Sequence, residues 1–484
     1  MNYRITGRII GLILLIEGAF MMPSVAICIF DGDKTSLKAF LLTLVLIAFV
    51  SAILMYICRN AKKEMGARDG LVCVGLSWIV MSIFGCLPFI FSGYIPNVTD
   101  AIFEIVSGFT TTGASILKDV ESLSRGILFW RSFTHWIGGM GVLVFLLAIL
   151  PMSDRSGGFT LHLLRAESPG PDVGKLVPRI KKTATILYLI YILLTILNIA
   201  FLLFGGMPLF DSLCTAFGCA GTGGFSIKND SMAGYSPYLQ NVCTVFMMLF
   251  GVNFSCYYLL LCRRFKDLWK DEELRFYIIT ALASMAVIAV NISGMYPTLE
   301  ETVRHAAFQV SSIMTTTGFA TTDFDLWPSL SKAILLCLMV IGASAGSTGG
   351  GFKCGRVVLL VKSLRRHIRQ TLYPQKVQLI RMNGNVVEES VLKNTMAFMG
   401  AYVIIVMLSY IILSIDNFSS TTNYAAVLAC FNNIGPGLAA VGPTCNYGSY
   451  GILSKLVLTA DMLAGRLEIF PILVLFSPST WRKR

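Results

Sequence analysis

The feature that most constrains this chain is a short stretch rich in glycine and threonine that occurs four times. Each copy follows a short apolar segment that suits a helix, and each lies between two long apolar runs. The copies are residues 107–115, 218–226, 312–320 and 430–438, with alignable glycines at Gly113, Gly223, Gly318 and Gly435. Irregular backbone at membrane depth must be surrounded by protein or by a water-filled cavity, so the repeat predicts four similar units around one axis.

The residue types in these loops suit a cation. Glycine permits positive φ and a close approach of backbones, so an extended loop can offer carbonyl oxygens to an ion in place of water. The helix before each loop would point the negative end of its dipole at that ion, and threonine hydroxyls add oxygens without a fixed charge. We therefore expect the loops to form a cation filter. The alternative is four ordinary Gly/Thr turns at the membrane surface.

The composition predicts a polytopic membrane protein, because 55% of the residues are hydrophobic and only 14% are charged, whereas a soluble chain is about a quarter charged. Basic residues gather in alternate loops, which by the positive-inside rule puts these loops and both termini in the cytoplasm. Topology thus explains the net charge of +12, and we expect no nucleic acid partner. The 13 cysteines lack metal-site spacing, and no disulfide framework or metal cluster is expected.

The predicted fold is all-α, with ten spans and four re-entrant short helices. Two spans, 8–30 and 37–58, precede the repeats. The return spans are expected near 127–150, 238–262, 330–362 and 452–476. The predicted units are 1–70 (two N-terminal transmembrane helices), 71–151 (pore repeat 1), 152–270 (cytoplasmic loop and pore repeat 2), 271–385 (pore repeat 3 with a cytoplasmic linker) and 386–484 (pore repeat 4).

A second unusual stretch, residues 342–351, interrupts the third return span. It reads Gly-Ala-Ser-Ala-Gly-Ser-Thr-Gly-Gly-Gly, and each glycine costs a helix about 1 kcal/mol relative to alanine. We expect the helix to break there and the stretch to line a cavity below the third loop, where it could act as a gate. A nucleotide-binding P-loop is excluded, because Phe352 separates the last glycine from Lys353.

Arg466 lies in an apolar segment, where a charge is costly and usually functional. One interpretation is that its side chain faces the pore below the filter and repels cations while the gate is shut. The other is a structural ion pair with Asp461 or Glu468. The two interpretations are compatible.

Together, the four loops, the 342–351 stretch and the Arg466 segment resemble the Trk/Ktr/HKT superfamily of potassium transporters. The two additional N-terminal spans resemble the membrane subunit of the bacterial Trk uptake system rather than the shorter Ktr type. The resemblance covers essentially the whole chain. It implies a pseudo-four-fold K⁺ pore, a homodimer in the bacterial plasma (inner) membrane, and a cytosolic nucleotide-binding regulatory subunit of the RCK type.

The resemblance also implies site residues. The expected K⁺ filter comprises Thr111, Thr112, Gly113, Gly221, Thr222, Gly223, Thr316, Thr317, Gly318, Asn433, Ile434 and Gly435. The expected gate comprises Gly346, Ser347, Thr348, Gly349, Gly350, Gly351 and Arg466. In this superfamily a serine at the first filter glycine accompanies sodium transport in some members, so Gly113 favours K⁺.

The leading hypothesis is therefore a gated, K⁺-selective pore that supports uptake. The alternatives are a K⁺ symporter coupled to H⁺ or Na⁺, since broken helices and inward charges suit that class, and a less selective K⁺/Na⁺ pathway. We find no catalytic triad, metal-ligand cluster or cofactor motif. We therefore expect no enzyme activity and no organic cofactor, with K⁺ as the transported ion.

Overall fold

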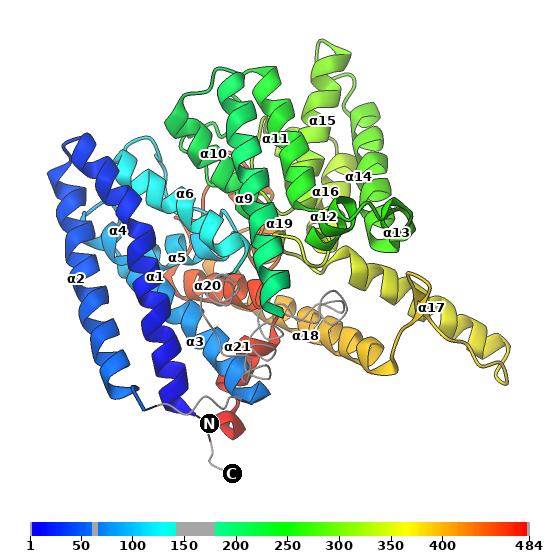
Figure 1. Cartoon of the computed structure of the whole chain (residues 1–484). Coiled ribbons are helices and arrows are strands. Elements are labelled where there is room, and N and C mark those ends of the chain that lie inside the picture. The colour runs from blue at the N-terminus through cyan, green and yellow to red at the C-terminus, as the bar shows by residue number, and fades with distance from the viewer. Residues whose placement is uncertain (1, 61–65, 142–179, 482–484) are drawn as a thin grey trace.

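The computed structural model describes residues 2–60, 66–141 and 180–481, and this part of the chain is predominantly helical (Figure 1). Its strands are β1 (Arg381–Met382) and β2 (Asn385–Val386), which form one antiparallel hairpin. Six described helices are long and apolar enough to cross a membrane, or seven if one bent pair counts as a single span. The predicted class, an all-α polytopic membrane protein, is confirmed.

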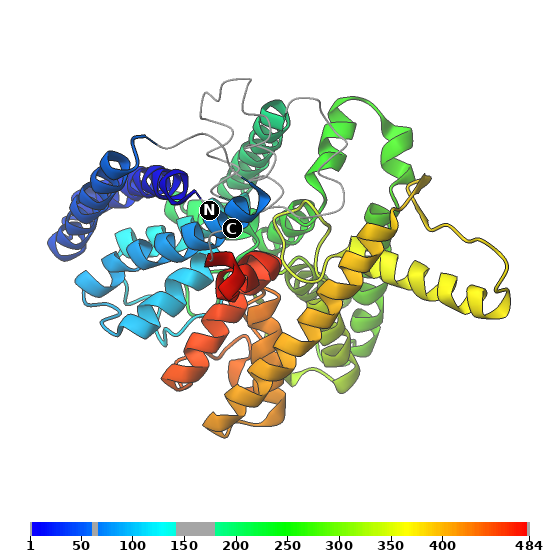
Figure 2. The same ribbon diagram turned by 90° about the horizontal axis from the view of Figure 1, so that it is seen from below.

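The two N-terminal spans are α1 (Tyr3–Phe30) and α2 (Lys34–Ile57), as predicted from the first two apolar runs. The side chain of Asp33 starts α2, because it accepts hydrogen bonds from the backbone N–H groups of Thr35 and Ser36. α1 packs against α2 and also against helices of the first repeat. This pair therefore lies to one side of the repeats (Figures 1 and 2).

Four long helical segments open the four repeats, and a short helix follows each of them. The long segments are α3 (Ala67–Gly85) continued by α4 (Leu87–Phe91), α9 (Ile180–Phe204), α14 (Glu272–Asn291) and α18 (Glu389–Leu413). The short helices are α5 (Val98–Phe109), α10 (Leu209–Gly221), α15 (Leu299–Met314) and α19 (Ser420–Phe431). Side-chain N-caps from Asn97, Thr298 and Ser419 fix where three of the short helices begin.

The return helices follow a cyclic order of packing. They begin as α6 (Arg125–Gly139), α11 (Pro237–Phe250), α16 (Ser329–Ile341) and α20 (Ile452–Arg466). α6 packs on α10, α11 on α15 and α16 on α19, and α20 packs on α5. Each return helix thus contacts the short helix of the next repeat, and the fourth contacts that of the first. The short helices are therefore held in a closed arrangement.

The second and fourth predicted return spans, 238–262 and 452–476, are interrupted in the structure, and these interruptions were not predicted from the sequence. α11 is followed by α12 (Phe254–Leu261) at a bend of 88°. α20 is followed by α21 (Phe470–Phe476), and the residues before α21, Glu468 and Ile469, have φ of 55° and 68°. The third return helix breaks between α16 and α17 (Cys354–Leu372), as predicted. The first, α6, ends at Gly139, and residues 142–150 of its predicted span lie outside the described residues, as does most of the 151–182 loop.

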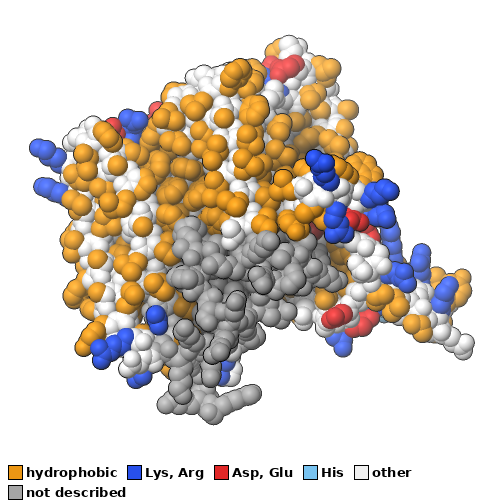
Figure 3. Space-filling model, viewed as in Figure 1, with side chains coloured by type: hydrophobic (Ala, Val, Ile, Leu, Met, Phe, Trp, Pro, Cys, Tyr) orange, Lys and Arg blue, Asp and Glu red, His pale blue; other side chains and the backbone are white. Residues whose placement is uncertain are grey.

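The outer surface suits lipid. Among the described side chains on the face shown in Figure 3, apolar ones predominate, and most lysine and arginine lie toward its edges. Val45 and Phe49 on α2 are among the exposed apolar residues, at 65% and 63%. An apolar face of this extent is typical of a membrane-embedded protein. α17 extends beyond the rest of the helical body in both ribbon views (Figures 1 and 2), and α13 (Phe265–Lys270) and α22 (Pro478–Trp481) complete the helices.

Candidate ion pathway at the meeting of four loops

The four loops leave their short helices by the same backbone conformation. In each, a backbone N–H group just after the helix donates a hydrogen bond to the carbonyl oxygen five residues earlier. These bonds are Thr112 to Ser107 (2.9 Å), Gly223 to Gly218 (2.9 Å), Thr317 to Ser312 (2.8 Å) and Ile434 to Ala429 (2.9 Å). Each preceding residue is left-handed: φ is 56° at Thr111, 54° at Thr222, 60° at Thr316 and 56° at Asn433. Four segments far apart in sequence therefore have one local structure.

This geometry corrects the alignment of the second loop by one residue. Two positions after the left-handed residue, a glycine with positive φ follows in every loop, and in the second loop this glycine is Gly224, with φ of 72°. Gly223, which we aligned with Gly113, instead matches Thr112. The error arose because Gly223 and Gly224 are adjacent, so the sequence leaves two registers open. The equivalent triplets are 111–113, 222–224, 316–318 and 433–435, and Gly221 lies just before its triplet.

The loops meet in a closed ring. A Cβ atom added to any of the four equivalent glycines would lie closer than 3.0 Å to a carbonyl oxygen of a neighbouring loop. These pairs are Gly113 with Gly223 O, Gly224 with Thr317 O, Gly318 with Ile434 O, and Gly435 with Thr112 O. Real Cβ atoms essentially never approach so closely. Glycine is therefore required at these positions both by positive φ and by the adjoining loop.

Polar side chains also connect the loops. The Thr112 hydroxyl lies 2.8 Å from that of Thr110 and accepts a 2.9 Å hydrogen bond from Asn433 Nδ2. In the third loop, the hydroxyls of Thr315 and Thr317 lie 2.7 Å apart. All of these side chains are buried. The first and fourth loops are thus joined by a side-chain bond as well as by backbone contact.

A buried ion pair supports the first two loops and was not predicted. Arg131 Nε on α6 lies 2.7 Å from Glu104 Oε1 on α5, and both side chains are almost fully buried. The Glu104 carboxylate also accepts hydrogen bonds from Ser115 Oγ and Ile116 N, each 2.9 Å, just after the first loop. Arg131 donates to Ser226 O at 2.9 Å, just after the second. The pair therefore connects the exits of both loops.

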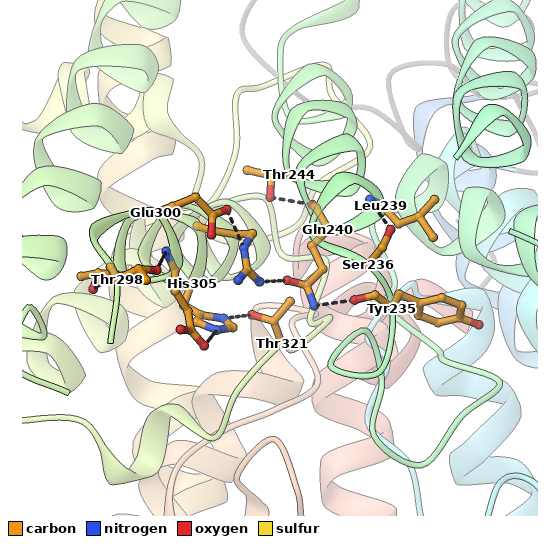
Figure 4. Close-up of polar contacts among 12 residues, drawn as sticks. Tyr235, Ser236, Leu239, Gln240, Thr244, Thr298, Glu300, His305 and Thr321 are labelled. Carbon is orange, nitrogen blue, oxygen red and sulfur yellow. Dashed lines mark hydrogen bonds and ion pairs between the residues drawn. The ribbon is translucent and has the colours of Figure 1, made fainter. Parts of the chain in front are cut away.

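A second polar network joins the second and third repeats on their loop-exit side (Figure 4). Gln240 Nε2 on α11 donates to the carbonyls of Met232 (3.0 Å) and Tyr235 (3.2 Å), and its oxygen accepts from Arg304 on α15. His305, the next residue on α15, lies 2.9 Å from the Thr321 hydroxyl beyond the third loop. Neither network was predicted, because its residues are scattered in sequence and gather only in the fold.

The predicted break at 342–351 docks on the break in the second return helix. Ser344 N donates to Gly251 O (3.1 Å), Phe254 N donates to Gly346 O (3.0 Å), and the Thr348 hydroxyl donates to Phe250 O (3.2 Å). Two interrupted helices thus satisfy one another's free backbone groups, which lipid cannot do. Gly350 N also donates to the Thr316 hydroxyl at 2.7 Å, which ties the stretch directly to the third loop.

Arg466 joins the 342–351 stretch to the end of α6. Its guanidinium donates to Thr348 O (2.7 Å), to Gly139 O (2.7 Å) and to Gly138 O. The carboxylates considered as partners contact other groups: Glu468 pairs with Arg356, and Asp461 accepts a 2.9 Å hydrogen bond from Ser409. The interpretation of Arg466 as the ion-pair partner of Asp461 or Glu468 is therefore wrong. Its side chain instead links two backbone segments through hydrogen bonds.

Glu273, which was not predicted, links the same stretch to the start of α17. Its Oε1 on α14 accepts hydrogen bonds from Ala345 N (2.7 Å) and from Gly355 N (2.8 Å) in the first turn of α17. The carboxylate is buried. Because α17 is the helix that projects from the body, Glu273 connects the position of α17 to that of the stretch.

Known proteins resemble the chain over its whole length. A family model described as "TrkH: Cation transport protein" matches residues 36–483. The Trk system potassium uptake proteins TrkH of Salmonella typhimurium and Escherichia coli K12 are each 38% identical to it over 496 residues, covering 100% of both chains. The E. coli K12 protein TrkG is 32% identical over 488 residues, covering 99% of both. The crystal structure of the potassium transporter TrkH from Vibrio parahaemolyticus matches with a TM-score of 0.88 and 32% identity over 100% of both chains.

Proposed function

The chain belongs to the TrkH family of cation transport proteins, and from this premise we propose that it is the K⁺-translocating membrane subunit of a potassium uptake system. The family transports ions, so the chain is not an enzyme, as predicted. The observation that carries the proposal is the closed ring of four equivalent loops, in which each glycine adjoins a carbonyl of another loop. A ring of backbone carbonyls is the standard means of replacing the water shell of K⁺.

The selectivity filter in this proposal consists of the four triplets 111–113, 222–224, 316–318 and 433–435. Their helices α5, α10, α15 and α19 end at these triplets, so the negative ends of four helix dipoles converge on the ion. Gly113 in the first triplet supports K⁺ over Na⁺, as expected from the superfamily resemblance. The domain limits predicted from the sequence stay part of this proposal.

The gate in this proposal is the 342–351 stretch together with Arg466. Its closed form would be held by the bonds of Arg466 to Thr348 O and Gly139 O and by those of Glu273. The guanidinium adds a positive charge below the ring, which opposes the passage of cations. Movement of α17 would reach the stretch through Gly355 and Glu273.

Partners and membrane follow from the same resemblance. We propose a homodimer in the bacterial inner membrane, with both termini cytoplasmic and an RCK-type nucleotide-binding subunit on the cytoplasmic face. The names of the relatives, which refer to a Trk system, support a system of several components. α1 begins and α22 ends at the same edge of the molecule in Figure 1, which supports the common side of the termini.

Coupled transport is the competing proposal, and buried carboxyl groups favour it. Asp461 bonds Ser409 through one oxygen, and its other oxygen has no hydrogen-bond partner among the described residues. Such a group in a membrane span can carry a proton. Symport with H⁺ or Na⁺ would make K⁺ flux depend on the gradient of the second ion.

The decisive test is Rb⁺ uptake into liposomes that contain the purified chain. A selective pore gives uptake that follows the Rb⁺ gradient and resists competing Na⁺. Uptake that shifts with a pH or Na⁺ gradient would favour symport, and equal uptake of Rb⁺ and Na⁺ would contradict a K⁺ filter.

A further inference from the structure

We propose that His135 is a positioning residue for the ion pathway, whose imidazole occupies the place of the side chain that the second loop lacks at Gly223. This inference rests on the proposed function of the four loops. It concerns the asymmetry of the ring, in which one of four equivalent positions is a glycine without positive φ.

The position in question carries a buried side chain in the other three loops. Thr112, Thr317 and Ile434 occupy it, and each is fully buried. Gly223 is their equivalent by the bond from its N–H to Gly218 O. Because this residue is not left-handed, its backbone does not require glycine. Some other group must therefore occupy the space beside it.

That group is the ring of His135 on α6. A Cβ atom added to Gly223 would meet Nδ1, Cγ and Cε1 of His135 closer than 3.0 Å, and these are its three nearest neighbours. A Cβ added to Gly221 would meet the backbone carbonyl of His135 equally closely. The second loop therefore packs directly on this one residue, with no room for a side chain of its own.

Two hydrogen bonds fix the orientation of the ring. His135 Nδ1 lies 2.8 Å from Gly108 O near the end of α5, and Nε2 lies 3.2 Å from Phe225 N just after the second loop. A carbonyl only accepts and an amide N–H only donates, so Nδ1 carries the proton and Nε2 does not. The imidazole is thus neutral, and it connects the first short helix to the exit of the second loop.

The position of the ring bears on the filter because the loops adjoin one another. Gly223 O is the carbonyl that faces Gly113 of the first loop. A shift of Gly223 toward an empty His135 site would move this carbonyl out of the ring. His135 lies three residues before Gly138. In the other three return segments a methionine lies three residues before a glycine: Met248 before Gly251, Met339 before Gly342 and Met462 before Gly465. Histidine thus occurs only where the filter residue is glycine.

The test is a double-mutant cycle on the full chain in liposomes, measured as the ratio of Rb⁺ to Na⁺ uptake. His135→Ala should lower this ratio by about tenfold, the factor expected from losing roughly one buried hydrogen bond. Gly223→Ala should abolish uptake, because its methyl group collides with the ring. In the double variant the added methyl group occupies the vacated space, so uptake should recover above that of Gly223→Ala and the ratio should become measurable again.

The control is His367→Ala, because His367 is exposed on α17 and its removal should leave the ratio unchanged. If His135→Ala is not obtained as folded protein, His135→Met replaces it, since methionine fits the other return helices. A wild-type ratio in either folded variant, or a double variant no better than Gly223→Ala, would overturn the inference. If wild-type protein itself fails to prefer Rb⁺, the proposed function fails instead, so the two failures are distinguishable.

Discussion

Replacing Arg466 by alanine should open the pathway in the absence of any partner. The guanidinium joins two segments, the 342–351 stretch and the end of α6, through bonds to Thr348 O and to Gly138 O and Gly139 O. A hydrogen bond from a charged donor contributes about 1.5 kcal/mol or more. Counting one such bond for each segment gives about 3 kcal/mol, or about 150-fold in the ratio of closed to open protein.

The assay is basal Rb⁺ flux in liposomes without a regulatory subunit, normalised to the folded protein in the bilayer. Arg466→Lys separates two explanations, because lysine keeps the charge and loses the planar fork that reaches both segments. If the bonds hold the gate, the lysine variant should also have a raised flux. If the charge alone is the barrier, its flux should stay low. The matched control is Arg125→Ala, which removes an exposed arginine. An unchanged flux in Arg466→Ala would refute the reasoning.

The other predictions concern the loop supports, the stretch and the corrected register. Glu104→Gln leaves a buried arginine unpaired and should lower the free energy of unfolding by about 3–5 kcal/mol. The control, Asp31→Asn, removes an exposed ion pair and should lower it by at most about 1 kcal/mol. Thermal unfolding in detergent measures both changes. Deleting residues 345–350 should raise basal Rb⁺ flux, and no rise with normal membrane insertion would count against a gate. Gly224→Ala should abolish Rb⁺ flux, because φ at this residue is 72° and Thr317 O adjoins it. The control, Gly206→Ala, should retain flux, because Gly206 has φ of 81° but no neighbour within 4 Å of an added Cβ. Equal flux in both variants would contradict the ring.

Local chemistry determined which parts could be predicted from the sequence. The loops and the 342–351 break are rich in glycine, which destabilises a helix, so the sequence indicated where they lie. The break before α21 could not be predicted, since the run around Glu468 and Ile469 contains no glycine cluster. There the chain turns where Glu468 pairs with Arg356 on α17, a partner more than a hundred residues away.

The same limit applies to the site. The register of the second loop could not be predicted because adjacent glycines allow two alignments, and only φ distinguishes them. Glu104 and Arg131 are 27 residues apart, and neither has a local pattern that indicates a pair. A charged residue on a short helix that leads into a filter loop, followed by an opposite charge in the return helix, is the signal that could have been used.

The mutual bonding of the breaks in the second and third return helices has a consequence for how the proposed gate would open. When the stretch leaves its seat on Phe250, Gly251 and Phe254, donors and acceptors on both sides lose their partners at once. Water that enters the pathway could then hydrate them. Opening of the gate and entry of water would then be one event. Conditions that lower the activity of water should therefore keep the gate closed without acting on the ion.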